Sequence, residues 1–165
     1  MATRSKYMFF LFLFLSGICS VQFAQQMSVE LKDLSKGADI ILTGKVTQQS
    51  SSWNDNNTRI YTEATIQVNE YLKGNSRESY VVVRYLGGEV GDVGELYSHM
   101  PRFEDNEEVL VFLTKDTQNS IYKVFNGEEG KINIIEDQQT GEKLTTSNVK
   151  LSSLKVQIAN YINEQ

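Results

Sequence analysis

Few residues of this chain could carry out covalent chemistry. It has one histidine, His99, and one cysteine, Cys19, so a Ser–His or Cys–His pair would have to use one of these two side chains. No serine stands in the Gly-x-Ser-x-Gly pattern that exposes a nucleophile on a sharp turn. A protein zinc centre takes three or four histidine, cysteine or carboxylate ligands, which a single histidine does not suggest. We therefore predict no catalytic, cofactor-binding or metal-binding residue, and interpret His99 as a solvated loop residue.

Side chains with oxygen ligands for calcium gather at three places, Asp55-Asn56-Asn57 and the acidic residues within 89–95 and 104–108. None has the Asp-x-Asp-x-Asp-Gly spacing with a later glutamate that marks a calcium loop. The glycines between Gly87 and Gly94 follow a predicted strand, but no helix pattern and no Lys-Ser/Thr pair come after them, so we interpret them as turn residues. Two carboxylates facing each other across a cleft, as glycoside hydrolysis requires, stay open as an alternative, although the sequence indicates no particular pair.

Aromatic and arginine side chains in polar segments are better candidates for function, because these residue types dominate the energetics of protein interfaces. One such segment is the polar loop that we expect at residues 49–57, and another is the irregular connection over residues 87–107. A connection of this length is uncommon in a compact domain and often functional. The predicted partner-binding residues in these two segments are Trp53, Tyr97, His99 and Arg102.

The first residues predict a secretory signal peptide rather than part of the fold. Arg4 and Lys6 precede an unbroken apolar run at residues 7–15, which is too short to span a membrane and is followed by small residues. We expect residues 1–24 to be removed, with cleavage after Ala24 or after Ser20, and the protein to be periplasmic or extracellular. A lipid-modified Cys19 is the less favoured alternative, because the bulky Ile18 precedes it.

The remaining chain, residues 25–165, should form one acidic domain without a transmembrane span. The whole chain has a net charge of −5, and losing the two cations of residues 1–24 makes it −7. Because an acidic surface repels phosphate groups, we expect no nucleic-acid partner. Without Cys19 the domain has no disulfide and depends on its hydrophobic core alone.

Residues 38–88 carry the clearest structural signal, three apolar-alternating runs separated by polar turns. Apolar residues recur at every second position within residues 39–48, 58–72 and 79–86, which predicts an antiparallel meander. Gly44 within the first run indicates a bulge or tight bend. Shorter strands are expected at residues 109–114, 121–125, 131–136 and 142–146.

Helices are expected only at the two ends of the domain. Residues 27–37 suggest a short helix closed by a cap at Gly37. Residues 151–163 place apolar side chains on one helical face, with Ser147 or Ser152 as the capping residue. Short strands at regular spacing with terminal helices favour a mainly β fold, a small antiparallel OB-like barrel, and a β-sandwich is the alternative.

Several stretches resemble a family of small exported bacterial β-barrel proteins that are mostly uncharacterised. They are ADIILTGKVT, IYTEATIQVNEYLKG, VVVRYLGGEVG and PRF…EEVLVFL, within residues 38–132. The ADxxxxGKV opening is also similar, more weakly, to netrin-like OB barrels of the tissue-inhibitor-of-metalloproteinase type. Those inhibitors bind a protease zinc ion through a disulfide-clamped N-terminal cysteine. Here Cys19 has no partner cysteine, so no functional residue is carried over.

These observations predict an exported, non-enzymatic module that binds a protein or an envelope component and needs no cofactor. A protease inhibitor of the OB type is the alternative that the weaker resemblance implies. A hydrolase with an unrecognised carboxylate pair is the third and least favoured interpretation.

Overall fold

The computed structural model describes residues 30–75, 77–116 and 121–164. The chain divides into two compact units, Met1–Asp33 and Leu34–Gln165. Of the first unit only residues 30–33 are described, and they are helical. The predicted signal peptide, its cleavage sites and Cys19 therefore lie outside the described residues. All strands and the C-terminal helix belong to the second unit.

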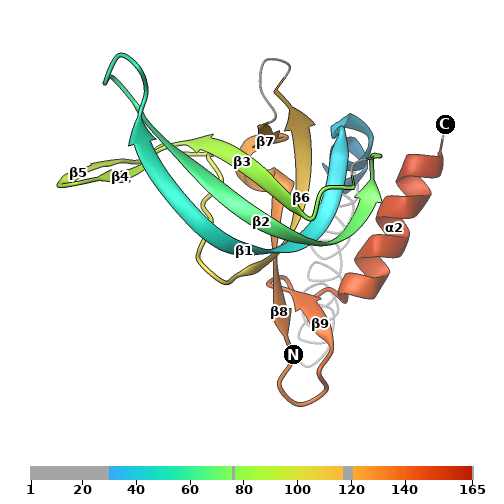
Figure 1. The fold of residues 1–165 in the computed structure, drawn as a ribbon. Coiled ribbons are helices and arrows are strands. Elements are labelled where there is room, and N and C mark those ends of the chain that lie inside the picture. Colours follow the sequence, from blue (N-terminus) through green and yellow to red (C-terminus); the bar gives the residue numbers. More distant parts are fainter. Residues whose placement is uncertain (1–29, 76, 117–120, 165) are drawn as a thin grey trace, which may run out of the picture. The chain divides into compact units, whose positions relative to one another are not determined.

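The predicted meander forms the centre of the second unit (Figure 1). Strand β1 (Ile40–Trp53) pairs antiparallel with β2 (Ile60–Lys73), and β2 pairs antiparallel with β3 (Tyr80–Leu86). A two-stranded hairpin, β4 (Gly88–Val90) and β5 (Val93–Glu95), follows β3. The other elements are β6 (Glu108–Lys115), β7 (Tyr122–Val124), a 3-10 turn η1 (Gly127–Gly130), β8 (Lys131–Glu136), β9 (Lys143–Thr145) and α2 (Leu151–Asn163).

The main sheet closes on itself into a five-stranded barrel. Its strands follow the order β1-β2-β3-β7-β6, and β6 pairs antiparallel with β1 to complete the ring. The pairing of β3 with β7 is parallel, whereas the other pairings in the ring are antiparallel. Strand β8 continues along β6 beyond β7, and β9 pairs with β8. This is a mainly β, OB-like barrel, as the sequence predicts, and the alternative of a β-sandwich is wrong because the sheet is closed.

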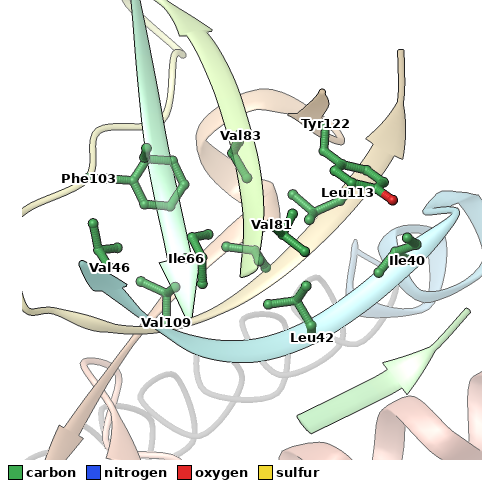
Figure 2. Close-up of a cluster of buried hydrophobic side chains, with 12 residues drawn as sticks. Ile40, Leu42, Val46, Ile66, Val81, Val83, Phe103, Val109, Leu113 and Tyr122 are labelled. Atoms are coloured by element: carbon green, nitrogen blue, oxygen red, sulfur yellow. The ribbon is translucent and has the colours of Figure 1, made fainter. Parts of the chain in front are cut away.

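Alternating apolar side chains of the ring strands fill the barrel (Figure 2). The buried cluster consists of Ile40, Leu42, Val46, Ala64, Ile66, Val81, Val83, Phe103, Val109, Val111, Leu113 and Tyr122. All but Phe103 come from β1, β2, β3, β6 and β7. Because these side chains leave water together when the ring closes, the hydrophobic effect stabilises the closed barrel.

A bend in β1 lets one strand pair with both β2 and β6. The register between β1 and β2 shifts at Thr43/Gly44 and again at Val46/Gln48. A Cβ atom at Gly44 would lie 2.5 Å from the Gln67 carbonyl oxygen, so only glycine fits there. Bulges and glycines bend strands in this way in closed sheets, which confirms the bend predicted at Gly44.

Both predicted helices are present, except that residues 27–29 of the first lie outside the described residues and that the caps differ. Residues 30–37 are helical, but the φ angle of Gly37 is not positive, so Gly37 does not form the predicted left-handed cap. Its lack of a side chain makes room for the Phe125 ring. Helix α2 buries Leu151, Leu154 and Ile158. Its N-cap residue is Lys150, which makes no capping hydrogen bond with its side chain. The predicted serine caps are therefore wrong.

Residues 49–53 of the predicted loop 49–57 belong to strand β1, whereas residues 54–57 lie in the turn between β1 and β2. Strand β1 pairs with β2 without interruption from Gln48↔Thr65 to Trp53↔Ile60. This ladder, rather than apolar alternation, keeps the segment extended. The connection 87–107 is likewise more ordered than predicted, because it contains the β4–β5 hairpin.

Candidate binding site at the barrel mouth

The inward face of the β1–β2–β3 sheet changes from apolar to polar at one end of the barrel. Ala64 and Val83 are fully buried, and the next inward residues of β2 and β3 are Thr62 and Tyr85. On β1, Gln49 and Ser51 lie opposite Ala64 and Thr62 in the register. This polar end of the inner face is called the barrel mouth here.

Hydrogen bonds tie the polar side chains of the mouth to one another. The hydroxyls of Ser51 and Thr62 lie 2.8 Å apart, and Thr62 donates to the Gly87 carbonyl at 2.7 Å. Tyr85 donates its hydroxyl proton to Gln49 Oε1 at 3.0 Å. Burial raises the pKa of the Tyr85 hydroxyl, so it stays protonated at neutral pH. The mouth therefore offers fixed hydroxyl and amide groups.

Phe103 closes the mouth from the inside. Its side chain is only 5% exposed, and it lies in the core cluster (Figure 2). The rings of Tyr85 and Phe103 are 5.6 Å apart between centroids and tilted by 44°. The Lys131 ammonium lies 5.0 Å from the centroid of the Phe103 ring. Residues before and after Phe103 are thus anchored at one point of the barrel.

Two grooves lie on either side of residues 96–102. The first, called the mouth groove, has a volume of about 690 Å³ and runs between the barrel mouth, the β4–β5 hairpin and this loop. It is lined by Gln49, Ser51, Thr62, Tyr85, Leu86, Gly87, Gly88, Glu89, Gly94, Glu95, Leu96, Tyr97, Met100, Pro101, Arg102 and Phe103.

The second groove, called the side groove, has a volume of about 870 Å³. It is lined by Leu96, Tyr97, Ser98, His99, Met100, Pro101, Arg102, Glu104, Glu107, Glu128, Lys131, Ile132, Asn133, Thr146 and Ser147. Within it Lys131 Nζ lies 2.8 Å and 3.0 Å from the two carboxylate oxygens of Glu107, and it also donates to the Arg102 carbonyl. This buried pair fixes the path of the loop where the loop enters β6.

Tyr97 is held between a cation and a carboxylate. Its hydroxyl donates to Glu95 Oε2 at 2.9 Å and accepts from Arg59 Nη1 at 3.3 Å. The Arg59 guanidinium also lies 5.8 Å from the centroid of the Tyr97 ring. Glu95 Oε2 accepts a further bond from the Ile60 backbone N–H at 2.9 Å. A half-buried aromatic ring braced in this way loses little conformational freedom when it contacts a partner.

The residues beside Tyr97 are exposed. Leu96 is 71% exposed and borders both grooves. The Arg102 side chain is exposed, and its guanidinium makes no hydrogen bond or ion pair with a residue that the structure describes. His99 is also exposed, with a positive φ of 64°, and its carbonyl accepts the Glu128 backbone N–H at 3.0 Å. The backbone hydrogen bond at His99 thus holds the loop in place, while the side chains of Leu96, His99 and Arg102 are exposed and can contact a partner.

The structure places three of the four predicted residues together. Tyr97 and Arg102 line both grooves, and His99 lines the side groove. Trp53 is half-buried at the end of β1 and lines neither. Sequence reasoning missed Leu96, Gln49 and Ser51. Only Leu96 had a visible signal, an isolated leucine within a polar, glycine-rich segment.

Three further observations concern the chemistry and setting of the site. Among the described residues, no group of three or more histidine, cysteine or carboxylate side chains is placed to hold a metal ion. In the described part of the chain, no helix has both the length and the apolar character needed to cross a membrane. No known protein family matches the sequence, and no curated protein matches it either.

Proposed function

We propose that this protein is an exported binding module that holds a protein or an envelope component against residues 96–102 and the two grooves beside them. The observation that carries the proposal is Leu96, an apolar side chain left 71% exposed between the two grooves. An exposed leucine alone is ordinary. Here it lies beside the braced ring of Tyr97 and the unpaired guanidinium of Arg102.

The combination has the composition of an interface centre. Aromatic and arginine side chains are over-represented among the residues that contribute most to binding, and they act best when surrounding groups exclude water. The walls of the two grooves would surround a partner seated on Leu96. The export part of the proposal depends on the signal-like pattern of residues 1–24.

Capture from an envelope or secreted fraction of the source cells, with matched variants, tests this proposal. Leu96→Ser should reduce recovery of the specific partner by about ten-fold, the loss expected for one interface anchor. Val156→Ser is the control, because Val156 is 61% exposed on α2, away from the grooves. It should leave recovery unchanged.

Both variants should keep the melting temperature of the parent, because neither side chain is buried. Equal recovery with Leu96→Ser and with the parent protein would contradict the proposal. Equal loss with both variants would also contradict it, since the interaction would then be unspecific.

A further inference from the structure

We infer that β1 takes an extended, positively flanked peptide segment as an additional strand along its free edge, from Gln49 to Trp53. The inference rests on the proposed function, because it names how the partner is held. Strand addition supplies affinity through main-chain hydrogen bonds and requires a strand with one unpaired edge.

The first step is to establish which backbone groups of β1 lack a partner. Asn54 donates its backbone N–H to the Arg59 carbonyl at 2.9 Å, so Asn54 faces β2. Successive residues of a strand direct their backbone groups to opposite edges, and the register from Gln48 to Trp53 is unbroken. Trp53, Ser51 and Gln49 therefore direct their N–H and C=O groups away from β2.

The hydrogen bonds of β2 lead independently to the same assignment of the backbone directions in β1. The Gly87 backbone N–H donates to the Ile60 carbonyl at 2.8 Å, so Ile60 faces away from β1. Ile60 is the register partner of Trp53. The pair Trp53–Ile60 thus makes no ladder hydrogen bonds, in agreement with the parity counted from Asn54.

The second edge of β1 is occupied only up to Val46. Strand β6 pairs with β1 from Ile40 to Lys45, and the Val46 N–H and C=O bond to the backbone of Glu107 and Asn106, each at 2.9 Å. After the bulge at Val46/Gln48, no backbone of the described residues bonds to this edge. A row of unpaired donors and acceptors is a template for another strand.

The surroundings of this edge can receive one. Gln49 and Ser51 line the mouth groove together with Thr62 and Tyr85, so the groove lies over the inner face of the sheet and reaches the strand that has the free edge. The segment from Thr47 to Trp53 has no charged residue and no proline, which are the usual guards of an exposed edge. A strand added at this edge would border the mouth groove, which Leu96 also lines.

Charge decides between a foreign peptide and a second copy of this chain. Asp55 follows the Trp53 end of the edge, and Asp105 contacts Gln49 at the other end, where its Oδ1 accepts from Nε2 at 3.1 Å. Glu104, Glu89 and Glu95 add negative charge nearby, and the acids outnumber the two cations there, Arg59 at the Trp53 end and Arg102 in the mouth groove. The chain has a net charge of −5, so a second copy would be repelled, whereas a segment with lysine or arginine at its ends would be attracted.

The test is a displayed library of peptides with seven randomised residues and a lysine at each end, selected for binding to the full chain. The strongest enriched peptide is synthesised, and its affinity is measured by titration calorimetry. Ser51→Pro removes the outward N–H without removing a bond to β2, and proline is tolerated on such edges. We expect it to weaken binding about ten-fold or more, the effect of losing main-chain bonds and strand register.

Ser51→Ala is the matched control, because it loses the same contact with Thr62 but keeps the N–H. It is the reference for Ser51→Pro, and it should bind the peptide about ten-fold or more tightly than Ser51→Pro does. A peptide methylated on alternate backbone nitrogens tests the same bonds without altering the protein, in case Ser51→Pro fails to fold. One of the two alternately methylated forms should lose binding, and amide exchange at Gln49, Ser51 and Trp53 should slow in the complex with the unmodified peptide.

Several results would overturn the inference. They are an absence of enriched peptides, equal binding by Ser51→Pro and Ser51→Ala, and exchange protection elsewhere on the barrel. Sedimentation showing a dimer that Ser51→Pro dissociates would assign the edge to a second copy instead. If recovery of the captured partner falls with Leu96→Ser but is unchanged with Ser51→Pro, the proposed binding function is supported and strand addition is refuted.

Discussion

Replacing Phe103 with alanine should destabilise the barrel strongly, although Phe103 stands in a loop. Truncating a buried phenylalanine costs about 3–5 kcal/mol, and Phe103 is 5% exposed within the core cluster. Its ring pair with Tyr85, at 5.6 Å between centroids, contributes about 0.5–1.5 kcal/mol beyond burial. The mouth groove, which Phe103 lines, admits water to the space left behind, which relieves part of the cavity cost. We therefore expect a loss near the lower limit, about 3 kcal/mol.

Equilibrium unfolding in urea measures this loss. Trp53 is the only tryptophan, so its fluorescence reports one site, and far-ultraviolet circular dichroism provides a second probe. Phe103→Leu keeps most of the apolar volume and should cost only about 1 kcal/mol. Tyr97→Ala, at a half-buried ring, should also cost about 1 kcal/mol or less. If Phe103→Ala changed the free energy of unfolding by under about 1 kcal/mol, Phe103 would not be part of the core and the account of the barrel mouth would be refuted.

Three further predictions follow from single contacts. Glu107→Leu should cost about 3 kcal/mol, because it leaves the Lys131 ammonium, only 9% exposed, without its carboxylate, and adding Lys131→Met should recover much of that loss in urea unfolding. If the losses of Glu107→Leu and Lys131→Met were additive in the double variant, the pairing would be contradicted. Hydrogen bonds from the Lys115 N–H and the Thr114 hydroxyl lower the pKa of Asp39 below its ordinary value of 3.8, so this carboxylate stabilises the fold above that pH, and the contribution is lost as the pH falls through the lowered pKa. Asp39→Asn should therefore flatten the acid side of the stability profile, and a profile with an unchanged acid side would contradict this account. Gly88→Ala should destabilise the fold by more than about 2 kcal/mol, because φ is +130° and the added Cβ would lie 2.1 Å from Thr62 Oγ1, whereas Gly91→Ala, at φ +60° with no atom within 4 Å, should cost about 1 kcal/mol. Similar melting temperatures for the two variants would contradict this prediction.

The sequence predicted those parts of the fold that depend on local periodicity. The run that became β2 alternates apolar and polar residues, the run that became β3 is largely apolar on both faces, and α2 lies at residues 151–163 as expected. The extension of β1 through Gln49–Trp53 was missed because its residues, QSSSW, carry no apolar alternation. That segment is extended because β2 pairs with it, which is a tertiary cause that no local pattern records.

The candidate site was predictable only in part, for a similar reason. Tyr97, His99 and Arg102 could be grouped because they are neighbours in the sequence. Trp53 was grouped with them on residue type alone, and the structure separates it from both grooves. The polar floor made by Gln49, Thr62 and Tyr85 comes from three strands, so it becomes visible only once the register of those strands is known.

The pairing that closes the barrel has a consequence for the speed of folding. Ile40 at the start of β1 pairs with Leu113 near the end of β6, so the whole meander and the loop after it must be bridged before the ring is complete. Such long-range pairings have a large loop-closure entropy and slow the folding of β proteins relative to helical ones. The local hairpins of β1, β2 and β3 can form earlier. Until β6 arrives, β1 has an open edge along its entire length, so chaperones that bind exposed strands have their longest opportunity at this stage.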